Sequence, residues 1–265
     1  MKFVVFYMVA LIIICYEKEE NANVIYSTTS ILPMDTSKTI TSSQKIVEED
    51  SITFLTYEDI KILNIPYADE IIKNSKTYSL RPGLVAGIIK QESQFKHYVR
   101  SHKNAIGLMQ VIPDRAGQEV NKMLYKKNEP LEDSLLYNPS FNIKIGCAYI
   151  YHMEKYYFKD IENEISKRYC LISGYNTGVG NVIKIFVNEE DIKNIEGYDT
   201  LKGYYRFKAR MQVAIQKINS MTSSEVRDHL KNNLPNDETI NYLDKVTTYI
   251  ENWKDSINQT QVAMN

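Results

Sequence analysis

A glutamate interrupts an apolar helical stripe in the stretch GIIKQESQF. At 3.6 residues per turn, the positions that share the face of Val85 are Ile88, Ile89, Glu92 and Phe95. A buried carboxylate without a partner is costly, and it avoids that cost by keeping its proton, which raises its pKa. A carboxylic acid that stays protonated near neutral pH is a general acid. The pattern predicts a catalytic role for Glu92; the alternative is a glutamate at the edge of the stripe that reaches water or a cation.

The residue types and spacings in the sequence exclude several other kinds of catalytic site. The four histidines, His97, His102, His152 and His229, lack metal-ligand spacing. The stretch GVGNVI lacks the third glycine of a dinucleotide fingerprint and follows no strand. The Gly-x-Ser-x-Gly pattern of a nucleophilic serine is absent from the sequence. We therefore predict neither a metal nor a cofactor, and a lone acid on an apolar face remains.

The elements that position this acid are predicted to be helices. Pro82 favours a helix start, and the helix that carries Glu92 is expected to run to about Phe95. Residues 97–111 lack helical period at first and are expected to form a loop or short hairpin beside the active-site cleft. Helices are expected again after YNPSFN, from about Glu164 to Ser173, and in the tail ETINYLDKVTTYIENW, with a break at NTGVG. The fold class is predicted to be mainly α, with at most a small β element.

The N-terminal segments differ from the rest of the chain. MKFVVFYMVALIIICY has one early lysine followed by an uncharged run, which is short for a membrane span and typical of a signal peptide. We assign residues 1–22 to a signal peptide or lipoprotein-type signal, with an uncleaved anchor or a core helix as alternatives. Residues 23–52 form a Ser/Thr-rich linker, 53–256 one folded domain and 257–265 a tail. This organisation predicts export.

The three cysteines leave two questions open. Cys15 ends the apolar run, where a bacterial lipoprotein carries its lipidated cysteine, but Ile14 precedes it where such signals have a small residue. Cys147 and Cys170 each lie among small or apolar residues of helical segments. Two buried free thiols are favoured there, although an exported protein would permit a disulfide.

Charge and composition narrow the classes of partner. The net charge is −1, with 32 basic and 33 acidic residues, and basic residues do not gather into long blocks. Nucleic acid is therefore not expected as a partner. The twenty tyrosines are more suggestive, because their rings can stack on sugar faces while their hydroxyls form hydrogen bonds.

Three ordered motifs carry a resemblance to a known family. ESQF, GLMQVIP and GYNTGVGNV resemble the Glu-Ser, Gly-Leu-Met-Gln and Ala-Tyr-Asn-x-Gly signatures of the soluble lytic transglycosylase (SLT) family, which has a lysozyme-like fold. INSMTSSEVRDHL and ETINYLDKV are similar to the end of its membrane-bound transglycosylase C branch. Two departures stand out: Gly174 replaces the usual Ala, and residues 188–212 look like an insertion relative to that branch.

The resemblance implies an activity on peptidoglycan glycan strands. Glu92 would protonate the oxygen of the β-1,4 bond between N-acetylmuramic acid and N-acetylglucosamine. The resulting carboxylate would then take the proton of the muramoyl C6 hydroxyl, which closes a 1,6-anhydro ring without water. The substrate's own N-acetyl group would stabilise the cationic centre, so a second carboxylate is not needed. The implied location is the bacterial cell envelope, in the periplasm and with membrane attachment as an option.

The same resemblance implies further site residues, each with a structural alternative. Ser101 matches a serine that hydrogen-bonds the catalytic acid, or else it caps its own loop. Gln110 would orient substrate or acid. The other residues expected at the cleft are Met109, Tyr175, Asn176, Glu238 and Tyr242. Met109 is alternatively a core residue, Asn176 a turn former, Glu238 a helix-surface glutamate and Tyr242 a core tyrosine.

Two other functions are compatible with the same motifs. One is a lysozyme-type hydrolase on this fold, which uses water as the nucleophile. The other is a wall-binding module that kept the cleft and lost turnover. Retention of an ionisable group on an apolar face argues against the second, because a binding module gains little from it.

Overall fold

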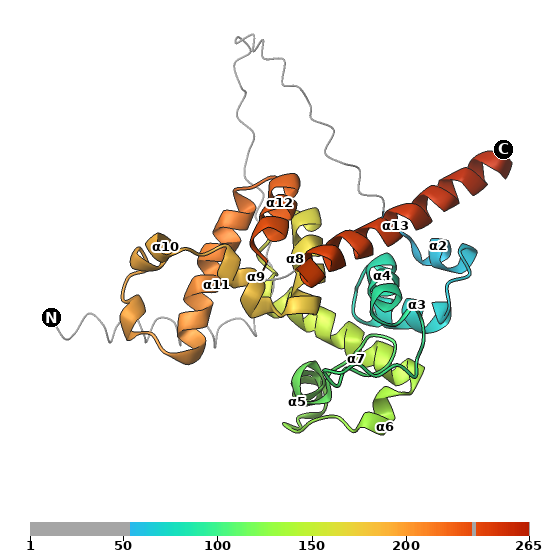
Figure 1. The fold of residues 1–265 in the computed structure, drawn as a ribbon, viewed down its shortest axis with the longest axis horizontal. Helices are drawn as coiled ribbons and strands as arrows, with labels where there is room; N and C mark the ends of the chain where they lie inside the picture. Colours follow the sequence, from blue (N-terminus) through green and yellow to red (C-terminus); the bar gives the residue numbers. More distant parts are fainter. Residues whose placement is uncertain (1–53, 235–236, 265) are drawn as a thin grey trace, which may run out of the picture. The chain divides into compact units, whose positions relative to one another are not determined.

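A computed structural model describes residues 54–234 and 237–264, and the regular structure of these ranges is helical (Figure 1). No strand occurs in them, which confirms the predicted mainly α class. The elements in chain order are α2 (Tyr57–Ile62), α3 (Ala68–Thr77), α4 (Pro82–Ser93), the π-helix η1 (Pro113–Gly117), α5 (Gln118–Tyr125), α6 (Asp133–Leu136), α7 (Pro139–His152), the π-helix η2 (Met153–Tyr157), α8 (Glu164–Thr177), α9 (Val179–Ile185), α10 (Glu189–Lys193), the 3-10 helix η3 (Tyr198–Thr200), α11 (Gly203–Asn219), α12 (Ser223–Asn233) and α13 (Asp237–Met264).

The helix of the candidate acid, α4, has Pro82 at its first position, as predicted. It ends at Ser93, two residues earlier than expected, because Gln94 and Phe95 both adopt left-handed backbone conformations with φ of 52° and 61°. The expectation that Phe95 continues the helical face of Glu92 is therefore wrong. Phe95 instead belongs to the turn that starts the following loop.

The segment predicted to be a loop or short hairpin is a loop with isolated pairings. Ile106 forms single antiparallel bridges with Arg100 and Val111, and these bridges do not extend into strands. Left-handed conformations recur along the loop, at Asn104, Gly107 and Gln110. Since a strand needs a continuous extended backbone, these residues confine the β element to single bridges.

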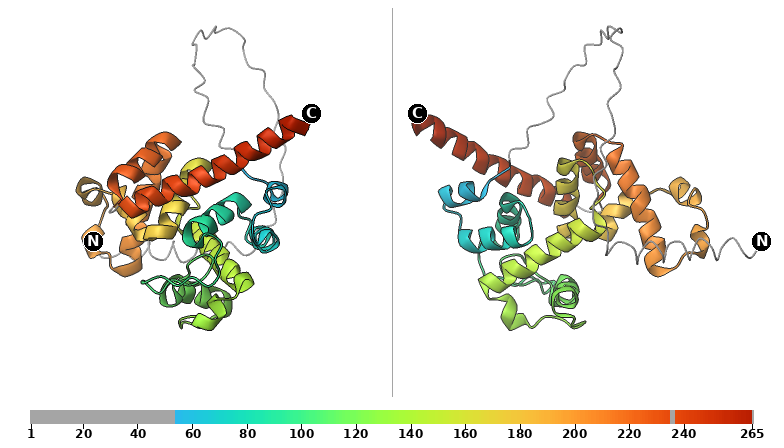
Figure 2. Two further views of the ribbon diagram at one scale, coloured as in Figure 1. Left: turned by 45° about the vertical axis from the view of Figure 1, so that its right-hand side comes forward. Right: turned by 180° about the vertical axis from the view of Figure 1, so that it is seen from behind.

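The long C-terminal helix α13 packs against α4 and α8 (Figures 1 and 2). Gly87 makes the approach to α4 possible: a Cβ there would lie 3.2 Å from Val246 Cγ1 and 3.3 Å from Ile250 Cγ1. A larger side chain at this position would push the two helices apart. The close crossing brings the first turns of α13 to the C-terminal end of α4, where Glu92 lies.

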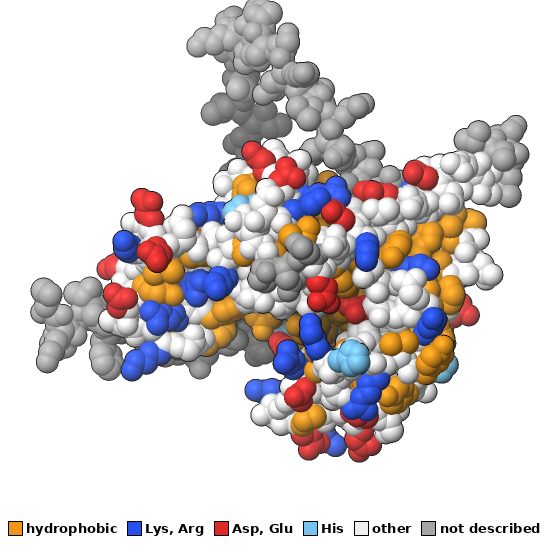
Figure 3. Space-filling model, viewed as in Figure 1, with side chains coloured by type: hydrophobic (Ala, Val, Ile, Leu, Met, Phe, Trp, Pro, Cys, Tyr) orange, Lys and Arg blue, Asp and Glu red, His pale blue; other side chains and the backbone are white. Residues whose placement is uncertain are grey.

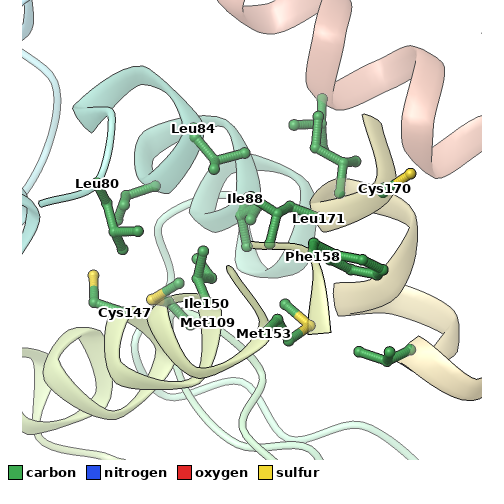
Figure 4. Close-up of a cluster of buried hydrophobic side chains, with 14 of the residues drawn as sticks. Leu80, Leu84, Ile88, Met109, Cys147, Ile150, Met153, Phe158, Cys170 and Leu171 are labelled. Carbon is green, nitrogen blue, oxygen red and sulfur yellow. The ribbon is translucent and has the colours of Figure 1, made fainter. Parts of the chain in front are cut away.

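A buried apolar cluster lies among α4, α7 and α8 (Figure 4). Cys147 on α7 and Cys170 on α8 are part of it, and both are buried free thiols, as favoured from the sequence. Burial raises the pKa of the Cys170 thiol to about 12 and that of Cys147 further. Both thiols therefore stay protonated and act as apolar packing groups.

The motif GYNTG ends one helix and starts the next. Gly178, with φ of 87°, separates α8 from α9, so the predicted break is confirmed four residues beyond the expected helix end at Ser173. Residues 188–212, the segment set apart in the sequence, contain α10, η3 and the first half of α11.

The described helices belong to one compact unit of the chain, Asp50–Asn265. The predicted signal at residues 1–22 and the linker at 23–52 lie outside the described residues, and Cys15 with them. Among the helices that are described, none has a stretch apolar and long enough to span a bilayer.

Candidate active site

Glu92 lies in the last turn of α4, partly buried and bonded to a residue 150 positions away. The Tyr242 hydroxyl, from the start of α13, donates a hydrogen bond of 2.7 Å to Glu92 Oε1. Tyr242 is itself buried, with 3% of its surface exposed. This contact fixes the orientation of the carboxyl group and directs the second oxygen, Oε2, away from the tyrosine.

The surroundings raise the pKa of Glu92 to about 7. Burial is the largest cause, and the negative charge of Glu238 acts in the same direction. The hydrogen bond from Tyr242 opposes both, because it stabilises the carboxylate. Ile88 and Ile89, both fully buried on the same helix, supply the predicted apolar setting. Both the acid form and the carboxylate form of Glu92 are thus accessible near neutral pH.

Tyr175 joins the GYNTG and GLMQ motifs. Its hydroxyl donates a hydrogen bond of 2.7 Å to the backbone carbonyl of Met109. Burial raises the pKa of Tyr175 well above 10, and the charge of Glu92 contributes to the same shift. Burial likewise raises the pKa of Tyr242 well above 10, and the charge of Glu92 contributes to this shift as well. The two phenols and the carboxyl group therefore form one cluster from α4, α8 and α13.

The Gln110 side chain stabilises the loop in which it lies. Its Nε2 donates to the Gly107 carbonyl at 2.9 Å and to the Val99 carbonyl at 3.2 Å, while its backbone is left-handed with φ of 46°. The amide oxygen Oε1 takes no hydrogen bond that is recorded among the described residues, so it is free to accept one from a ligand. The position is consistent with the expected orienting role, which stays a prediction.

Met109 is placed on the core side of the same loop. Its side chain is fully buried and touches α7 at Gly146, where any Cβ would collide with the Met109 sulfur (Figure 4). The sequence allowed either a core role or a cleft-lining role for Met109, and its buried side chain has the core role. The residue contributes to the site through its backbone carbonyl, which Tyr175 holds.

The Asn142 side chain holds this loop in place through hydrogen bonds, and this role was not predicted from the sequence. Fully buried on α7, it accepts from the Met109 backbone N–H at 2.8 Å and donates to the carbonyls of Ile106 (2.8 Å) and Leu136 (2.7 Å). Gly107, with φ of 78°, leaves room for the Asn142 amide, which a Cβ would strike. The signal that could have revealed Asn142 is a lone amide among the apolar residues of FNIKIGCAYI.

Ser101 and Asn176 form no recorded hydrogen bond with Glu92 among the described residues. The Ser101 hydroxyl oxygen accepts from the backbone N–H groups of Lys103 (3.2 Å) and Ala105 (3.1 Å), which is the loop-capping role. Its own proton stays available to a further acceptor. Asn176 follows Tyr175 in the last turn of α8 and is partly exposed. Hydrogen bonds from these two side chains to acid or substrate stay predictions.

Glu238 lies one helical turn before Tyr242 and faces the loop across the site. Its carboxylate is 3.8 Å from the Lys103 ammonium, and both side chains are largely exposed. The pair connects α13 with the loop at residues 94–112. Figure 3 shows basic and acidic side chains interspersed over the face of the molecule that it displays, so neither sign of charge dominates that face.

The arrangement supports acid and base chemistry by one residue. The pKa of about 7 lets Glu92 donate a proton as an acid and accept one as a base at neutral pH. Tyr242 bonds to Oε1, which leaves Oε2 to carry the proton toward a reactant. Glu238 is exposed and faces a lysine, so its environment does not match that of a second buried acid.

Comparisons with known proteins agree with the motifs. Residues 69–196 match the family model of the Transglycosylase SLT domain. The chain is 36% identical over 180 residues to membrane-bound lytic murein transglycosylase C of Haemophilus influenzae, and 35% identical over 181 residues to that of Actinobacillus pleuropneumoniae. Each match covers 68% of this chain and 44% of the relative, so the chain spans less than half the length of these relatives.

Solved structures were matched as well. The lytic transglycosylase Slt of Pseudomonas aeruginosa, an inactive mutant, has a TM-score of 0.49 and 20% identity, with 74% of this chain and 25% of that chain covered. The 70 kDa soluble lytic transglycosylase of Escherichia coli has a TM-score of 0.47 and 19% identity, with coverage of 72% and 24%. The family model and the curated relatives, together with the three motifs, identify this chain as one that carries a transglycosylase SLT domain, at residues 69–196.

Proposed function

We propose that this chain is an exported lytic transglycosylase that cleaves peptidoglycan glycan strands without water. The observation that carries the proposal is the partly buried Glu92, with a pKa of about 7 and one oxygen bonded to Tyr242. The relatives are named as lytic murein transglycosylases, and we propose murein as the substrate of this chain as well.

The first step needs the protonated form of Glu92. Its proton moves from Oε2 to the glycosidic oxygen between N-acetylmuramic acid and N-acetylglucosamine, and the bond between that oxygen and muramoyl C1 breaks. The Tyr242 hydrogen bond to Oε1 stabilises the negative charge that develops on Glu92. The leaving sugar departs with a free hydroxyl.

The second step uses the carboxylate that the first has produced. Glu92 takes the proton of the muramoyl C6 hydroxyl, whose oxygen attacks C1 and closes the 1,6-anhydro ring. The acid form of Glu92 is restored, so proton transfers balance over one turnover. The substrate's acetamido group stabilises the cationic C1 centre between the steps.

The remaining site residues bind the strand on either side of Glu92. Gln110, through its amide oxygen, and Tyr175 approach the sugars from the loop and α8. Ser101 and Asn176 supply further hydrogen bonds, and Met109 supports the loop wall. Glu238, at the start of α13, contributes to the far wall of the cleft in this proposal.

The proposed location is the cell envelope, where murein lies. The relatives are named as membrane-bound, and the apolar run before Cys15 supplies a signal for export. Membrane attachment would come from a lipid on Cys15 or from the apolar run itself.

The test is digestion of purified sacculi by the wild-type chain and by Glu92→Gln. The amide keeps the shape of the side chain and can still accept from Tyr242, but it cannot supply a proton. We expect soluble muropeptides from the wild type and at least about a hundredfold slower release from the variant. Release by the variant within tenfold of wild type would remove Glu92 from the proposed role.

A further inference from the structure

A pocket of about 560 Å³ lies at the N-terminal end of α4, the end opposite to Glu92. Pro82, the first residue of α4, lines it, and Glu92 is about 15 Å further along the helix axis at a rise of 1.5 Å per residue. The apolar part of the wall consists of three buried leucines of the core cluster in Figure 4, which are Leu80, Leu84 and Leu171. None of the site residues described above lines the pocket, so it is separate from the candidate active site.

The lining of the pocket carries more basic than acidic groups, and its acidic groups already have partners. Glu164 lies 2.8 Å from Lys167, and Glu154 lies 3.5 Å from Lys155. No ion pair with a described residue is recorded for the other cations of the lining, which are Lys76, Arg81 and Arg168. The pocket therefore has an excess of positive charge that the described carboxylates do not neutralise.

Arg168 is the buried member of this group, with 6% of its surface exposed. Its guanidinium Nε is buried as well and has no hydrogen-bond partner among the described residues. Burial lowers the pKa of Arg168, while Tyr169 and the charge of Glu251 act in the opposite direction. The guanidinium is nevertheless charged at neutral pH. A buried charged donor without an acceptor is costly, so the pocket favours a ligand that brings an oxygen to Arg168.

The ring of Phe54 lies beside both guanidinium groups. Its centroid is 4.3 Å from Arg81 Cζ and 5.3 Å from Arg168 Cζ. Besides burial, the charge of Arg81 lowers the pKa of Arg168, which is the repulsion expected between like charges. An anion that contacts both groups would offset this repulsion.

The start of α4 adds to the positive potential of the pocket. The helix has 12 residues, no acidic residue in its first turn and no side-chain hydrogen bond at its N-cap, Arg81. The partial positive charge of its N-terminus is thus not offset by a carboxylate of the first turn. Helix starts of this kind bind anions such as phosphate. The hydroxyl groups of Thr56 and Ser79 also line the pocket and are further hydrogen-bond donors.

We propose that this pocket binds a phosphate group, as free phosphate or as part of a lipid headgroup. Arg81 and Arg168 donate hydrogen bonds to the phosphate oxygens, and Lys76 contributes a further positive charge. A tetrahedral phosphate accepts hydrogen bonds from several directions at once, which suits donors that come from α3, α8 and the start of α4. This inference does not depend on the proposed cleavage of glycan strands, because it concerns another site on the same domain.

The test is calorimetric titration of the full chain at constant ionic strength in chloride buffer. The probes are inorganic phosphate and glycerophosphoglycerol, which is the phosphatidylglycerol headgroup without its acyl chains. Arg81→Gln and Lys76→Gln each remove an exposed cation of the pocket. Lys73→Gln is the matched control, because Lys73 is exposed, lies on α3 as Lys76 does and is absent from the pocket lining. Arg168→Gln removes the buried donor; if it fails to fold in urea denaturation, the two exposed variants decide the test.

We expect the wild type to bind at least one probe, and each pocket variant to bind it about three- to tenfold more weakly, as the loss of one charged contact predicts. The control should bind as the wild type does. Tighter binding of glycerophosphoglycerol assigns the pocket to lipid headgroups, and tighter binding of inorganic phosphate assigns it to the free ion. Unchanged affinity in both exposed variants, an equal loss in the control, or no binding of either probe by the wild type would overturn the proposal.

The chain's own carboxylates are the competing occupant. Glu48, Glu49 and Asp50 come shortly before Phe54 in the sequence. The triple variant Glu48→Gln, Glu49→Gln, Asp50→Asn is therefore titrated with the same probes, and we expect it to bind them as the wild type does. Binding that appears only in the triple variant would show that these carboxylates fill the pocket, and would overturn the proposal of an outside ligand.

Discussion

Glu92 is balanced between burial, which favours its acid form, and the Tyr242 hydrogen bond, which favours its carboxylate. A residue that serves first as an acid and then as a base needs both forms at similar free energies near the working pH. The pKa of about 7 satisfies this requirement at neutral pH. The balance can be tested by removing either influence.

Tyr242→Phe removes the hydrogen bond and keeps the ring. Since the bond stabilises the carboxylate, its loss should raise the pKa of Glu92 further. Because the free enzyme needs protonated Glu92, wild-type kcat/KM should fall as the pH rises through about 7, and this falling limb should move to higher pH in the variant. Rate profiles measured from pH 5 to 9 check the shift. A limb that stays in place, or moves to lower pH, would contradict the role of Tyr242.

Glu92→Gln should also change how stability depends on pH. The pKa is about 7 in the folded chain against an ordinary 4.5, so between these values the folded state holds more protons than the unfolded state. The free energy of unfolding of the wild type therefore falls as the pH rises through this window, by about 3 kcal/mol at most. The variant has no carboxyl group at this position, so its free energy of unfolding does not fall for this reason in the same pH window. Urea denaturation at pH 4 and pH 8 should show an advantage of the variant that grows with pH; an equal difference at both pH values would count against the raised pKa.

At the scale of elements, the helix α4 and its acid could be predicted because the 3.6-residue period is a local property of the sequence. The break at Gly178 was predictable for the same reason. The Tyr242 hydrogen bond was not, since it joins residues 150 positions apart and depends on how α13 crosses α4 at Gly87. The left-handed pair Gln94 and Phe95 escaped prediction as well, because neither residue type favours that conformation.

The loop between α4 and η1 depends on a single amide on α7. Asn142→Ala leaves the Met109 N–H without its partner and removes the side-chain hydrogen bonds to the carbonyls of Leu136 and Ile106, the second of which keeps its bond from the Val111 N–H, so we expect a loss of about 2–4 kcal/mol in stability. Asn138→Ala, which removes only the N-cap of the same helix, serves as the control and should lose about 1 kcal/mol. Denaturant unfolding of both variants measures the difference. Equal losses would show that the loop does not rely on Asn142.

At the scale of the whole molecule, we propose that a catalytic domain follows a Ser/Thr-rich linker and an export signal, as the sequence predicts. The Ser/Thr-rich composition of residues 23–52 predicts a flexible linker, and thirty residues of a random coil have a root-mean-square span of about 30 Å. We propose that this reach lets the domain act on murein while its N-terminus stays at the membrane. The composition of residues 23–52 supports this arrangement, and the match to the SLT family model begins after this segment, at residue 69.

Lipid attachment can be separated from anchoring by the apolar run with one substitution. If Cys15 carries a lipid, Cys15→Ser should move the protein from the membrane fraction to the soluble envelope fraction, because the only acyl chains are lost. Fractionation of cells that express each form measures the change. Membrane association that persists in the variant would favour the apolar run as an uncleaved anchor.

The central claim is that the C6 hydroxyl, and not water, completes the reaction at Glu92. The most direct measurement is digestion of purified sacculi in water enriched in oxygen-18, followed by mass spectrometry of the soluble muropeptides. We predict 1,6-anhydromuramoyl ends that carry no oxygen-18 and are lighter by one water than hydrolytic products. Reducing muramic acid ends that carry the label would contradict it and would identify a lysozyme-type hydrolase.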